Sequence, residues 1–158
     1  MATKEYEAYE EMKAQVLTAV ALAVTENEIR ALHDPMLLSN RGLMGEDALI
    51  SVDSTCTEGW FAATSLSESH LLNYSFSFAA LEKERERLLN KPEWPEDKQW
   101  QARAVESNGW WYFYEEEPTP DESRWLGNDN RVDFSIGGKA HGFPAGYDWK
   151  ESLEFRPE

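Results

Sequence analysis

The sequence predicts an α+β domain in which N-terminal helices and a central helix pack on a small antiparallel sheet that ends in a C-terminal β-hairpin. Apolar residues recur at helical spacing near the N-terminus and again around residue 80, and the period changes to two after Pro95. A chain of 158 residues is the size of one ordinary domain. We therefore expect a single domain over residues 1–158, with a helical segment over 1–33 and a hairpin-containing module over 98–158.

Two consecutive helices are expected first. Residues 3–24 are rich in helix formers, carry four glutamates in the opening turns, and have apolar side chains at helical spacing: Met12, Val16, Leu17 and Val20. Thr25 followed by Glu28 matches a capping box, which predicts a second short helix to about His33. Asp34-Pro35 ends that helix, because the residue before a proline disfavours helical geometry.

The middle of the chain predicts two short strands and a helix. Residues 48–52 and 60–63 are short apolar runs near glycines, which is typical of strands around a turn. Residues 75–90 predict a helix, because four apolar residues lie on one side of it and charged residues fill the remainder: Phe78, Leu81, Leu88 and Leu89. Pro92 and Pro95 end this helix.

A β-hairpin is expected around Asn108-Gly109, a dipeptide favoured in tight turns. A two-residue loop pairs Val105 with Tyr112 and Ala104 with Phe113. One face is then expected to be core, with small residues opposite rings: Trp100, Ala102, Ala104, Trp111 and Phe113. The other face carries Arg103, Val105, Trp110, Tyr112 and Tyr114. A further strand over residues 131–136, a glycine-rich mobile loop over 137–146 and a final turn or strand complete the expected fold.

Composition limits the functions to be considered. The formal net charge is −15 and the pI is near 4.6, so the chain as a whole repels phosphate backbones and anionic membranes. We therefore expect no direct nucleic-acid binding and no membrane binding. Cys56 has no second cysteine to pair with, the N-terminus lacks the basic start of a signal peptide, and the apolar run 16–24 is short for a membrane span. These features predict a soluble cytoplasmic protein.

An acidic run follows the aromatic strand and is the strongest candidate for function. Prolines at 118 and 120 favour an extended segment. With the polar-tipped rings of the second hairpin face, the carboxylates predict a protein-binding surface: Trp110, Tyr112, Tyr114, Glu115, Glu116, Glu117, Asp121, Glu122, Asp129 and Asp133. The carboxylates can imitate the phosphates of a nucleic acid. The alternatives are a solvated loop and an aromatic face that another part of the chain covers.

No catalytic or cofactor-binding constellation is evident. Rings beside carboxylates also describe sugar sites, but abundant acids make chance pairs common. His33, His70 and His141 lack metal-ligand spacing, no Gly-x-Ser-x-Gly elbow surrounds the serines near His70, and the glycine-rich stretch lacks the spacing of a phosphate-binding loop. We expect no catalytic residue, no metal and no cofactor.

The last third of the chain resembles a Trp-rich module of uncharacterised accessory proteins from tailed bacteriophages and prophages. The resemblance rests on three motifs: Trp100-x-Ala102-x-Ala104-Val105; Gly109-x-Trp111-x-x-Tyr114-Glu115-x-x-Pro118 with a later Trp125; and Trp149-Lys150-Glu151-Ser152-Leu153 with Arg156-Pro157. This resemblance implies a small acidic protein in the cytoplasm of a bacterial host and supplies no catalytic residues.

In that setting the expected function is non-enzymatic inhibition of a host defence nuclease or nucleic-acid-binding complex, of the anti-CRISPR or anti-restriction type, through nucleic-acid mimicry. The expected partner is a host protein with a basic surface. The alternative is an interaction module whose acidity serves only solubility and which forms a homodimer through its apolar N-terminal helix. An enzyme is the third class.

Overall fold

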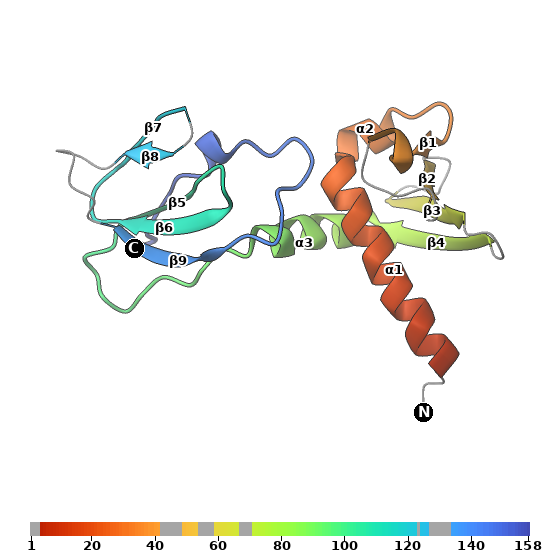
Figure 1. Ribbon diagram of the computed structural model, residues 1–158, viewed down its shortest axis with the longest axis horizontal. Coiled ribbons are helices and arrows are strands. Elements are labelled where there is room, and N and C mark those ends of the chain that lie inside the picture. The colour runs from red at the N-terminus through yellow and green to blue at the C-terminus, as the bar shows by residue number, and fades with distance from the viewer. Residues whose placement is uncertain (1–3, 42–48, 54–58, 67–70, 123, 127–133) are drawn as a thin grey trace. The chain divides into compact units, whose positions relative to one another are not determined.

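The computed structural model describes residues 4–41, 49–53, 59–66, 71–122, 124–126 and 134–158. The chain has an α+β fold with three α-helices and antiparallel sheets in this part, as predicted. Its backbone forms two compact units, and the prediction of a single domain stays a prediction. Unit 1 comprises residues 1–85 and 144–146, and unit 2 comprises residues 86–143 and 147–158. Figure 1 labels their elements.

Unit 1 begins with the two predicted helices, α1 (Lys4–Ala23) and α2 (Glu26–Arg30). The predicted capping box at the start of α2 is confirmed: the Glu28 backbone N–H donates to the Thr25 hydroxyl, and the Glu28 carboxylate accepts from the Thr25 N–H. The returning segment Pro144–Gly146 belongs to the same unit. There the Ala145 N–H donates to the Ala21 carbonyl at 2.9 Å, which satisfies a carbonyl in the last turn of α1.

The unit 1 sheet has the order β1-β2-β3-β4. Its strands are β1 (Met36–Leu37), β2 (Leu49–Asp53), β3 (Trp60–Leu66) and β4 (Leu71–Ser77), with a 3-10 turn, η1 (Leu38–Arg41), after β1. One face carries the buried side chains Ile50, Val52, Phe61, Ala63, Tyr74 and Phe76. Helix α1 contacts this face, because the Tyr9 ring lies 5.2 Å from the Tyr74 ring and Lys13 lies over Phe76. The other face carries mostly small and polar side chains such as Thr64 and Asn73.

The predicted helix over residues 75–90 is shorter in the structure. Residues 71–77 form β4, and α3 spans Phe78–Leu89, so the first residues assigned to the helix are a strand. The four predicted apolar positions of α3 are all buried. The Ser77 hydroxyl accepts from the Ala80 N–H at 3.0 Å, which is the bond that a capping serine makes to the third residue of a helix.

The unit 2 sheet has the order β10-β5-β6-β9. Its strands are β5 (Ala102–Val105), β6 (Trp110–Tyr114), β9 (Phe134–Lys139) and β10 (Glu154–Phe155), and a 3-10 turn, η3 (Trp149–Glu151), precedes β10. Strand β9 continues through Gly137 and Gly138, so the start of the predicted glycine-rich loop is a strand. A bulge in this pairing falls between Trp111 and Tyr112 of β6.

The register of the predicted hairpin was wrong by one residue. The loop has three residues, because the Glu106 N–H donates to the Trp110 carbonyl and Gly109 adopts a φ of 89°. A type I turn followed by a left-handed glycine makes this loop, so the same Asn-Gly dipeptide serves a longer connection. The observed partners are Val105 with Trp111 and Ala104 with Tyr112.

The corrected register exchanges the faces. Ala102 and Ala104 share a face with Tyr112 and Tyr114, and not with Trp111 and Phe113 as predicted. Trp111 and Phe113 lie instead on the face of Arg103 and Val105. Both faces of the sheet contribute to cores. The core on the face of Ala102 and Ala104 includes Tyr114, Trp125, Trp149 and Leu153. The core on the face of Arg103 and Val105 includes Leu89, Trp94, Phe143 and Tyr147.

Candidate partner-binding surface

The acidic segment predicted as a contact surface forms a short hairpin in unit 2, which we call the acidic hairpin (Glu115–Leu126, of which residue 123 is not described). Strands β7 (Thr119–Pro120) and β8 (Trp125–Leu126) pair within it. The Asp121 N–H donates to the Arg124 carbonyl at 2.8 Å and closes the turn between them. The segment is therefore folded back on itself by backbone hydrogen bonds.

Trp125 anchors the acidic hairpin to the sheet. Its side chain is buried against Ala102, Ala104 and Tyr114. Its indole N–H donates to the Val105 carbonyl at 2.9 Å, and its backbone N–H donates to the Glu106 carboxylate at 3.1 Å. Pro118, between the two groups of acids, is also buried. Buried Pro118 and Trp125 therefore anchor the hairpin at two points along its length, and its carboxylates are exposed on either side of Pro118.

The described acids of the hairpin all point outward. Five carboxylates are exposed on it: Glu115, Glu116, Glu117, Asp121 and Glu122. Gln99 donates to the Glu115 carboxylate at 2.6 Å. The only basic residue between positions 115 and 126 is Arg124. The net negative charge of the chain is divided almost equally between the two units. The acidic hairpin therefore differs from the rest of the chain in its local excess of acids and not in the net charge of its unit.

Glu106 lies beneath the hairpin and interacts with its one cation. Burial raises the pKa of the Glu106 carboxyl, although the Trp125 N–H, the positive charge of Arg124 and a hydrogen bond with Tyr112 act in the opposite direction. Arg124 is thus near a partly buried carboxylate of the sheet as well as the acids of the hairpin. The positive charge of Arg124 acts on Glu106, and the five exposed carboxylates of the hairpin outnumber this single cation.

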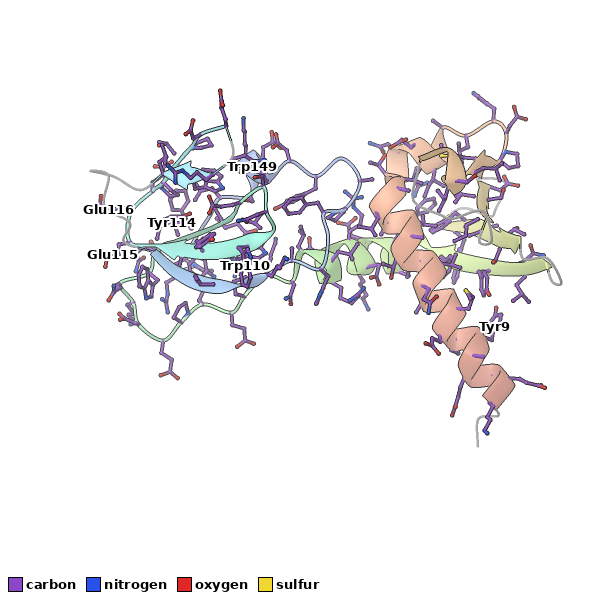
Figure 2. The ribbon with its side chains drawn as sticks, viewed as in Figure 1. Tyr9, Trp110, Tyr114, Glu115, Glu116 and Trp149 are labelled. Atoms are coloured by element: carbon purple, nitrogen blue, oxygen red, sulfur yellow. The ribbon has the colours of Figure 1, made fainter. Side chains whose placement is uncertain are left out.

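The structure separates the aromatic residues of the predicted surface from its acids. Trp110 and Glu115 lie at opposite ends of β6, as Figure 2 shows, and five residues of strand span about 17 Å. Trp110 is 39% exposed and lies beneath the Lys139 ammonium group. Tyr114 is only 5% exposed, and its burial, followed by the Glu106 and Tyr112 charges, raises the pKa of its hydroxyl.

Three residues of the predicted surface remain, Tyr112, Asp129 and Asp133, and the structure describes only the first of them. Tyr112 is half-buried, and burial and the neighbouring Glu106 raise its pKa. Asp129 and Asp133 lie outside the described residues. Sequence reasoning missed three exposed apolar side chains of unit 2, which are Leu126, Ile136 and Phe155. Ile136 pairs with Tyr112 across the β6–β9 ladder, a neighbour that only the observed bulge and register reveal.

No cluster of three or more histidine, cysteine, aspartate or glutamate side chains in the described ranges has metal-binding geometry. Within those ranges, no helix has the length and apolar character needed to cross a membrane. Comparison of the chain with protein-family profiles, curated proteins and solved structures finds no match. The acidic hairpin is therefore assigned as the candidate site from its own geometry.

Proposed function

We propose that this protein is a non-enzymatic binding protein whose acidic hairpin docks on the basic surface of another protein. The observation that supports this most is the fixed backbone under five exposed carboxylates, held by the buried Trp125 and Pro118. A pre-ordered anionic loop loses little conformational entropy when it binds. Its charge speeds encounter with a cationic partner and makes the affinity sensitive to salt.

The partner class we propose is a nuclease or nucleic-acid-binding complex of a bacterial host defence system. Such proteins have basic grooves for phosphates, and a row of carboxylates competes for them. The resemblance of the last third of the chain to accessory proteins of tailed phages supports this setting. Inhibition then results from occlusion of the groove, and no residue of this chain needs to perform chemistry.

Charge reversal tests the role of the hairpin. Changing Glu115, Glu116 and Glu117 to lysine is expected to abolish inhibition of DNA cleavage in a panel of purified restriction and RNA-guided nucleases. Stability should change little, because all three side chains are exposed. The matched control changes to lysine three exposed acids outside both the acidic hairpin and α1, Asp34, Glu82 and Glu93, and so alters net charge equally. Equal loss of inhibition in both variants would show that only net charge matters.

A second candidate function is an interaction module that is acidic only for solubility and self-associates through its N-terminal helix. The observation in its favour is that Tyr6 and Met12 of α1 are 55% and 40% exposed. Salt separates the candidates, because docking of the acidic hairpin weakens as ionic strength rises, whereas association through apolar surface does not.

A further inference from the structure

Strand β4 is an open edge of the unit 1 sheet. It pairs with β3 on one side, and among the described residues no backbone hydrogen bond reaches its other side. Natural edge strands are usually short or carry lysine, proline or other charges that prevent further pairing. β4 is seven residues long, and its sequence LLNYSFS contains no charge and no proline. In a chain with 28% charged residues, this edge lacks the usual protection.

Helix α1 extends past this edge. The contact between Tyr9 and Tyr74 places Tyr9 over β4, and the preceding turn of α1 lies further out (Figure 1). Lys4–Ala8 extend about 7.5 Å at the helical rise of 1.5 Å per residue. Neighbouring strands lie about 4.8 Å apart. The overhanging helix is therefore long enough to cover one further strand beside β4.

The surface around this edge is apolar. Leu72 is 39% exposed and lies on the same sheet face as Tyr74, the face that α1 covers. On the helix, Tyr6 and Met12 are 55% and 40% exposed and lie on the two flanks of the side of α1 that faces the sheet. Among the described residues of unit 1, both layers end at this border, where one more strand would continue the sheet and bury Leu72.

We propose that a second copy of this chain supplies that strand, through antiparallel pairing of the two β4 edges about a two-fold axis. An antiparallel edge is self-complementary under such an axis, so each copy gains the same contacts. Each overhanging α1 then covers the partner copy's β4. The two helices then run antiparallel on the same side of the joined sheet. A foreign peptide at β4 would leave this reciprocal cover unused.

This dimer is independent of the acidic hairpin, and salt affects it oppositely. Two chains of net charge −15 repel each other, and added salt screens this repulsion. Self-association is therefore expected to strengthen as ionic strength rises, whereas hairpin docking weakens. Reversal of Glu115, Glu116 and Glu117 lies in the other unit and should leave the dimer intact.

Sedimentation velocity of the full chain at increasing protein and salt concentration tests the proposal. Leu72→Lys and Met12→Lys are each expected to weaken dimerisation by about tenfold or more. Trp60→Lys is the matched control, because Trp60 is apolar and, at 47%, slightly more exposed than Leu72 and Met12, but lies on the opposite face of an inner strand. Thermal unfolding verifies that each variant folds. A monomer at every concentration, or a dimer that resists both edge variants, would overturn the proposal.

Cysteine cross-linking tests the strand pairing directly. In a Cys56→Ser background, Asn73 and Ser75 are both changed to cysteine, since both are exposed on one face of β4. Whether the two-fold axis passes nearest residue 73, 74 or 75, one pair of these positions faces its counterpart across the axis. Oxidation should therefore give a disulfide-linked dimer, which a Glu115→Cys control should not. Absence of the cross-link in a chain that still dimerises would place the interface elsewhere.

Discussion

The unit 1 sheet buries one face beneath α1, and the side chains on its other face are mostly small and polar. The unit 2 sheet packs side chains on both faces, beneath short segments such as β7–β8 and η3. Short coverings supply little apolar surface, so large rings fill the space that a long helix fills in unit 1. The concentration of aromatic residues between positions 100 and 125 thus reflects two-sided burial.

Two tryptophans of unit 2 also donate hydrogen bonds to backbone carbonyls at the ends of a helix and a strand. The Trp111 indole N–H donates to the Leu89 carbonyl at 2.6 Å, at the end of α3, and that of Trp125 donates to the Val105 carbonyl. The Ser152 hydroxyl accepts from the Val105 N–H at 3.0 Å, just beyond the β5–β10 pairing. Polar groups of side chains therefore join the coverings to the sheet in unit 2.

The largest expected effect on stability comes from removing the buried ring of Trp111 from the two-sided core of unit 2. Trp111→Ala is expected to cost about 3–5 kcal/mol, because Trp111 is completely buried and its indole hydrogen bond is lost. Trp110→Ala, one residue away and exposed, should cost less than about 1 kcal/mol. Amide exchange should accelerate in β5, β6 and β9 more than in β2 and β3. Equal costs for the two alanine variants would contradict the two-sided core.

Removal of two tyrosine hydroxyls, one in each unit, is expected to have smaller effects on stability, with opposite signs. The Tyr74 hydroxyl of unit 1 is buried without a hydrogen-bond partner in the described structure, and burial raises its pKa. Tyr74→Phe should therefore stabilise the protein by about 1 kcal/mol. In unit 2 the Tyr147 hydroxyl bonds to Ser152, and burial raises its pKa to about 12. Tyr147→Phe should destabilise by a similar amount in denaturant titrations, and the same sign for both would refute the contrast.

The smallest effect concerns Glu154 on β10. Burial favours its neutral form, but Lys91 at 2.7 Å and Arg103 at 2.6 Å outweigh burial and lower its pKa below the ordinary 4.5. The native state then holds fewer protons than the unfolded state, so this stabilisation is complete above pH 4.5 and is lost as pH falls through the lowered pKa.

Substitution of Glu154 isolates that contribution. Glu154→Gln should lower stability at pH 7 by no more than about 1 kcal/mol, because about a third of the side chain is exposed. Denaturant titrations between pH 6 and pH 3 should show a smaller acid-induced loss in the variant. Glu26→Gln, which breaks an exposed pair with Arg30 in unit 1, should cost less at pH 7. An unchanged acid profile for Glu154→Gln would refute the assignment.

Local signals in the sequence predicted the elements that local forces determine. The capping box at Thr25 and the amphipathic pattern of α3 are examples, because a cap and a helical face depend on residues three or four apart. Strand β4 was missed although Leu72, Tyr74 and Phe76 alternate with polar residues. The helical pattern of the following residues extended over it, and Ser77 was not recognised as the cap.

The candidate site was predicted only in part, because the exposure of its acids depends on local sequence, whereas the burial of its aromatic residues depends on contacts between distant parts of the chain. Exposure of the carboxylates follows from their number and the prolines among them, which a local pattern reveals. Burial of Tyr114 depends on Trp125 and Leu153, which come from separate parts of the chain, and on the register of the hairpin. A local pattern does not encode such distant packing, so the aromatic part of the predicted surface was overestimated.

The three-residue loop at Ser107-Asn108-Gly109 restricts how this region can evolve. Its length sets whether Ala104 faces Tyr112 or Phe113, and these two side chains lie on opposite faces of the sheet, Tyr112 against Trp125 and its neighbours and Phe113 against Trp94. Insertion or deletion of a single residue would exchange every side chain between the two faces at once. Homologous chains are therefore expected to keep the number of residues between Glu106 and Trp110 constant, and to keep at 108 a side chain that can accept from the Trp110 N–H, as Asn108 does at 3.0 Å.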